Sequence, residues 1–187
     1  MSTAPFYEAG RLSQIAINLF HGWGYNFYRL ENQLRADDLL VRAKVCETLG
    51  AARHSVEAAE AAWRQEFLPA PSRTQPRPEA KALRGAQTLE AIGRELGVLE
   101  GQIRSLPAPE SDRMTERFRT EAVTLRRLAE ADEVMAGHAE FLRALLVTAT
   151  ATWMIEAAVD IHASIMAVRN ALQDRSALLA GLSARAG

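Results

Sequence analysis

Apolar residues recur every three or four positions along most of the chain, which is the spacing of one face of an α-helix. The pattern predicts long helices over about residues 25–68, 79–106, 112–147 and 151–182, and a short helix over about 6–20. No segment alternates as a strand does, and there is no internal repeat. We therefore expect an all-α protein, an up-and-down bundle of four long helices plus a short N-terminal helix, in a single domain of residues 1–187.

Prolines and glycines mark most of the expected helix ends. Gly22 and Gly24 predict a turn, and a Pro-rich loop is expected at about residues 69–79. No proline or glycine separates Phe141 from Gln173, so two alternatives remain there. One is a tight turn near residues 148–150, and the other is a single very long helix. We prefer the turn, because an unbroken helix of that length would imply a coiled coil or a protruding arm.

Composition narrows the classes of function. The 187 residues are 48% apolar and 24% charged, so the chain can bury a core without disulfides or metal ions. The formal net charge of −1 gives no reason to expect binding to nucleic acid or to an anionic membrane. The N-terminal residues do not resemble a signal peptide, and no apolar run is long enough to cross a bilayer. A cytoplasmic, soluble protein is the expectation.

Residues 21–42 differ most from the Ala-, Leu-, Glu- and Arg-rich remainder, because aromatic, glycine and charged residues crowd together there. Placed on a helix, most of them can pack or pair locally. Asp38 is the exception, since it falls on the apolar stripe. A buried carboxylate must be neutralised, paired or bound to a metal. Arg35 and Arg42 are within helical reach, so an intrahelical ion-pair network is one interpretation.

Two histidines, His138 and His162, also fall among apolar residues, and we expect both to face the core. Carboxylates and imidazoles that project inward from facing helices are how bundles build di-metal sites. Such a site would hold a transition metal through four candidate ligands, namely Glu31, Asp38, His138 and His162. The Glu-x-x-His pattern of di-iron bundles is absent, which argues against the familiar version. A haem site on either histidine is a weaker alternative.

Two interpretations of function follow. The first is a non-enzymatic bundle that acts through self-association, as a homodimer, or through a protein partner. It draws on an Ala-rich seam (Ala58, Ala59, Ala61, Ala62), with Trp63 and Trp153 as anchors if they are exposed. The alternative is a metal- or small-molecule-binding bundle whose interior carboxylate and histidine site performs oxidative chemistry or only binds. No nucleophile motif, Walker loop or dinucleotide fingerprint is present, and whether the protein is an enzyme stays open.

Overall fold

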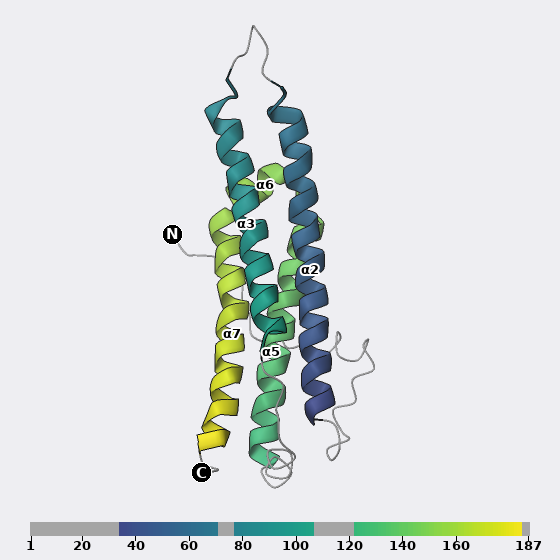
Figure 1. The fold of residues 1–187 in the computed structure, drawn as a ribbon, viewed down its shortest axis with the longest axis vertical. Helices are drawn as coiled ribbons and strands as arrows, with labels where there is room; N and C mark the ends of the chain where they lie inside the picture. Colours follow the sequence, from purple (N-terminus) through teal and green to yellow (C-terminus); the bar gives the residue numbers. More distant parts are fainter. Residues whose placement is uncertain (1–33, 71–76, 107–121, 185–187) are drawn as a thin grey trace, which may run out of the picture.

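Five helices make up the part of the chain that the computed structural model describes, residues 34–70, 77–106 and 122–184 (Figure 1). They are α2 (Leu34–Phe67), α3 (Ala80–Arg104), α5 (Ala122–Val147), α6 (Ala151–Glu156) and α7 (Ala158–Ala184). These residues contain no strand, which confirms the all-α prediction for them. The expected N-terminal helix and the turn at Gly22 and Gly24 lie outside the described residues.

The four long helices lie side by side, and consecutive ones run in opposite directions along the long axis (Figure 1). Helix α2 packs against α3 and α5, and α7 packs against the same two helices. Hydrogen bonds fix the antiparallel α2–α3 pair at both ends, because Trp63 bonds to Ala82 and Arg42 bonds to Leu106. The four long helices predicted from apolar spacing are thus packed against one another.

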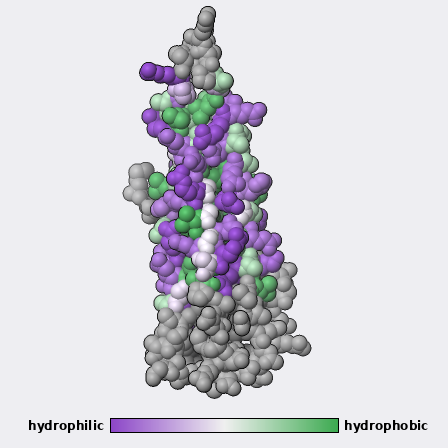
Figure 2. Space-filling model, viewed as in Figure 1, coloured by the Kyte–Doolittle hydropathy of each residue, from purple (hydrophilic) through white to green (hydrophobic). Residues whose placement is uncertain are grey.

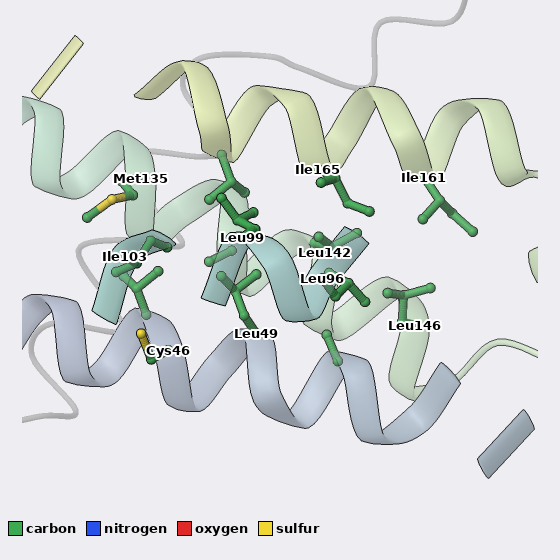
Figure 3. Close-up of a cluster of buried hydrophobic side chains, with 14 of the residues drawn as sticks. Cys46, Leu49, Leu96, Leu99, Ile103, Met135, Leu142, Leu146, Ile161 and Ile165 are labelled. Atoms are coloured by element: carbon green, nitrogen blue, oxygen red, sulfur yellow. The ribbon is translucent and has the colours of Figure 1, made fainter. Parts of the chain in front are cut away.

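The core forms where the apolar stripes of the four long helices meet (Figure 3). Each helix contributes aliphatic side chains that are completely buried, among them Leu49, Leu96, Leu99, Leu142, Leu146, Ile161 and Ile165. Burying one such side chain contributes about 1.5–3 kcal/mol. The bundle is therefore held together mainly by aliphatic packing.

Helix ends follow local chemistry. Helix α2 stops at Phe67, two residues before Pro69, since a proline disfavours helical backbone in the residue before it. Between α5 and α6, the Thr150 hydroxyl accepts a hydrogen bond from the Trp153 backbone N–H and caps α6. The turn preferred at residues 148–150 is confirmed. A second break at Ala157 was not predicted, because no proline or glycine marks it.

Helices α2 and α3 extend past the short, inclined helix α6 at one end of the bundle (Figure 1). Trp63 covers their contact there: its indole N–H donates to the Ala82 carbonyl at 2.9 Å, and its ring lies on Gly85. A Cβ added at Gly85 would sit 2.7 Å from Trp63 Cζ2 and 3.0 Å from Ile155 Cδ1 of α6. The lack of a side chain at Gly85 is what lets three helices meet at this point.

We predict that Gly85→Ala destabilises the protein although alanine is the better helix former. The gain in helix propensity, about 1 kcal/mol, is outweighed by overpacking, which typically costs about 1–3 kcal/mol. Urea denaturation followed by circular dichroism should give a lower free energy of unfolding. Gly101→Ala is the matched control, because a Cβ there meets nothing within 4 Å and should stabilise α3. Equal stabilisation by both variants would contradict the close approach of Trp63.

Candidate functional site

The predicted interior metal site is only partly within the described residues. Glu31 lies outside them, and Asp38 lies in α2 but its side chain is not among those described. Among the residues that are described, no three His, Cys, Asp or Glu side chains are grouped closely enough to hold a metal ion. The two histidines can be examined individually.

His162 does not face the core, so that prediction was wrong. Its side chain is 56% exposed, and Nδ1 lies 2.7 Å from Glu95 Oε2 of α3. Ile161 and Ile165 are the buried residues of α7 in this region, whereas Val159, one of the apolar residues near His162, is 80% exposed. His162 lies one position after Ile161, so its side chain leaves a different side of the helix.

His138 is half-buried on α5, in better agreement with the prediction. Removal from water lowers the pKa of this imidazole, because burial penalises its charged form. A neutral imidazole is suited to hydrogen bonding and to metal binding alike. His138 and His162 therefore have different environments, one half-buried and the other on the surface beside Glu95.

A buried ion pair that sequence reasoning missed joins α5 to α7. The Arg175 Nε–H donates to Asp132 Oδ1, and both residues are more than nine-tenths buried. Asp132 falls between the core residues Leu128 and Met135, so the spacing argument applied to Asp38 would have found it. Because each charge is removed from water, each depends on the other for compensation.

A second cluster of charges joins α2 to α3 around Glu100. The Glu100 carboxylate accepts a hydrogen bond from Arg104 Nη2 at 2.6 Å and lies 3.5 Å from Arg53 Nε. Its backbone carbonyl accepts from the Cys46 thiol, with a sulfur–oxygen distance of 3.6 Å. One helical turn away from Cys46, Arg42 Nη1 donates to the Leu106 carbonyl at 2.6 Å. These contacts hold the carboxylate and link the two helices.

Cys46 packs in the core next to Val45. Burial raises the pKa of its thiol, and the nearby Glu100 carboxylate adds to this effect against the guanidinium groups of Arg104 and Arg42. The thiolate is the reactive form of cysteine, so the thiol has low reactivity here. The buried charged groups of the described bundle (Arg42, Glu100, Asp132 and Arg175) thus take part in contacts that bridge helices.

Removing one partner of the Asp132–Arg175 pair should be strongly destabilising. Asp132→Ala leaves a buried guanidinium without its carboxylate, for which we expect a loss of about 3–5 kcal/mol in the free energy of unfolding. Combining Asp132→Leu with Arg175→Met should recover most of that loss, because aliphatic packing replaces both charges. Arg94→Ala, which removes an exposed pair with Glu90, serves as the control and should have little effect. A small effect of Asp132→Ala would argue against a buried pair.

His138 should make stability sensitive to acid. Its pKa in the folded protein is below the value of about 6.5 in the unfolded chain, so the unfolded chain binds the proton more readily. Stability should therefore be unaffected well above pH 6.5, and should fall below it until the folded imidazole is itself protonated. His138→Gln should flatten this decline in urea titrations between pH 7.5 and 5. An unchanged slope in His138→Gln would contradict the burial of this imidazole.

Comparison with known proteins gives no family for the chain: no family model, no curated protein and no solved structure matches it. Within the described ranges, no helix combines the length and apolar character needed to span a bilayer. Function must therefore be argued from the surfaces and contacts of this chain alone.

Proposed function

We propose that the protein is a non-enzymatic helical bundle that works by association, first of all with a second copy of itself. One observation carries the proposal: the face of α2 that points away from the core is exposed and rich in small and apolar residues. Its members are Leu40, Ala43, Ala51, Ala58, Ala61 and Ala62. They recur at helical spacing, interrupted by Glu47, His54 and Gln65. Alanine side chains permit the close approach of another helix.

The stripe corresponds in part to the Ala-rich seam noted in the sequence. Ala58, Ala61 and Ala62 are exposed, whereas Ala59 is partly buried against the core. The seam is therefore not used for packing within the bundle over most of its length. These exposed alanines on the outer face of α2 are therefore available for contact with a partner.

The two tryptophans do not have the role we considered for them. Trp63 and Trp153 are both partly buried and packed against the core, and Trp63 is also hydrogen-bonded to Ala82. Neither is an exposed anchor. On the face in view, the described surface is mostly hydrophilic, with hydrophobic residues in small separate patches (Figure 2). A contact through small residues fits such a surface better than one large apolar interface.

An interior metal site has less support than association. His162, one of its four candidate ligands, is exposed and bound to Glu95, and a core site would require it to face inward. The Asp132 and Glu100 carboxylates already have arginine partners. We therefore do not extend the proposal to oxidative or other metal chemistry.

The proposal predicts a dimer in solution. The mass of the purified chain, measured by sedimentation equilibrium across micromolar concentrations, should approach twice the 20.6 kDa of one copy. The mass should fall on dilution, as for a reversible interface between bundles. A mass of one copy at every concentration would remove the support for self-association and leave only a different partner.

A further inference from the structure

A cleft of about 450 Å³ lies between α3 and α7, at the level where α3 ends and α7 continues. The two helices are neighbours in the bundle (Figure 1). The volume of the cleft is within the range of about 300–1,000 Å³ that small-molecule sites occupy. None of the described residues that line it belongs to α2. The cleft is therefore separate from the outer face of α2, and what it binds does not depend on the proposed self-association.

The walls of the cleft are mostly polar, and the charge that they carry is positive. Arg169 of α7 is the one charged residue among the described residues that line it. Four neutral polar side chains from both helices share the lining, namely Gln102, Ser105, Gln173 and Ser176. Leu106 and Leu172 supply an apolar part. Such a lining is suited to a small organic anion.

Arg169 lacks the kind of partner that other arginines of the bundle have. Arg53, Arg104 and Arg175 each contact a carboxylate, whereas Arg169 forms no ion pair with any described residue. Its Nη1 lies 3.2 Å from the thioether sulfur of Met166, a weak acceptor, and its Nε is buried without a hydrogen bond in the described part of the chain. A buried donor without an acceptor is unfavourable. Turning the guanidinium toward an anion in the cleft would provide that acceptor at the loss of only the sulfur contact.

We propose that the cleft binds a small organic carboxylate, with its carboxylate group on Arg169 and its apolar part against Leu106 and Leu172. The planar guanidinium can donate two parallel hydrogen bonds to the two oxygens of a carboxylate. Gln102 and Gln173 are exposed, so their side-chain amides can turn to donate as well. One cation, two amides and an apolar wall thus match the two ends of such a ligand.

The position of the cleft favours a ligand with one negative charge over a phosphate dianion. Ser105, which lines the cleft, is the C-cap of α3, so the adjoining helix terminus is the negative end of the helix dipole. Helix termini that bind phosphate are N-termini. The carbonyls of Gly101, Ile103 and Leu106 already accept hydrogen bonds, which reduces their repulsion of an anion. Arg169 then balances one carboxylate, but it does not balance two charges.

An NMR titration of isotope-labelled protein with hexanoate tests the proposal. The side-chain amide signals of Gln102 and Gln173 should shift and saturate with a dissociation constant of about 1 mM, as for a small ligand held by one charged contact. 1-Hexanol has the same chain without the charge and should bind at least about tenfold more weakly. Absence of a shift at about 20 mM hexanoate, or equal binding of hexanol, would overturn the proposal. Tighter binding of inorganic phosphate than of hexanoate would also overturn it.

Substitution of Arg169 tests its role in the cleft. Arg169→Gln should raise the dissociation constant of hexanoate at least about tenfold, because the charged hydrogen bonds are lost. Arg94→Gln is the matched control, since it makes the same change in net charge at an exposed position of α3 and should leave the constant unchanged. An equal effect of both variants would show attraction by net charge alone and would contradict a site at Arg169.

A substitution at the exposed Gln173 gives a second test that does not remove a partly buried side chain. Gln173→Glu places a carboxylate four residues after Arg169, within helical reach of the guanidinium, and should weaken hexanoate binding at least about tenfold. Gln173→Ala, which removes the amide without adding charge, should weaken it by only about threefold. The Gln102 signal reports binding in every variant, and circular dichroism checks folding. If Arg169→Gln does not fold, Gln173→Glu decides alone, and unchanged hexanoate binding in it would overturn the proposal.

Discussion

The close contact of α2 with α3 at the end where both helices extend past α6 is the constraint on which much of the structure depends (Figure 1). Helix α2 has 34 residues, whereas α3 has 25 and α5 has 26, so α2 extends about 51 Å and α5 about 39 Å at 1.5 Å per residue. Beyond the ends of α5 and α7, other groups must cover the contact between α2 and α3. Trp63 and helix α6 cover it, and both pack against Gly85, whose lack of a side chain leaves room for them. The break at Ala157 then redirects the chain into α7.

The inner and outer faces of α2 differ in their contacts. The inner face of α2 is used along nearly its whole length, by the core and then by Trp63, while its outer face remains exposed and rich in alanine. Charged groups that join helices are concentrated elsewhere, at Asp132 with Arg175 and around Glu100. These interior charges join neighbouring helices, and we propose that the outer face of α2 serves association. The separation of the two roles is the basis of the functional proposal.

Much of the fold could be predicted from the sequence because aliphatic residues at helical spacing leave few alternatives. The ends at Pro69 and near Thr150 followed from local backbone chemistry. The exposure of His162 could have been predicted, because Ile161 and Ile165 form the buried stripe of α7 and His162 lies one position after Ile161. Asp132 and Glu100 could have been found by the argument that drew attention to Asp38. Arg104 follows Glu100 by four residues and is within helical reach of it. Arg175 and Arg53 could not have been assigned as partners, since they are far in sequence from Asp132 and Glu100.

Small-angle scattering of the dimer tests the central claim most directly, because it reports mass and shape together. Two bundles joined side by side through the outer face of α2 should give twice the mass of one copy with a maximum dimension close to that of a single bundle. The cross-section, in contrast, should widen markedly. A dimer joined end to end through the α2–α3 tip would nearly double the maximum dimension. That result, or scattering from a single copy at all concentrations, would contradict association through the outer face of α2.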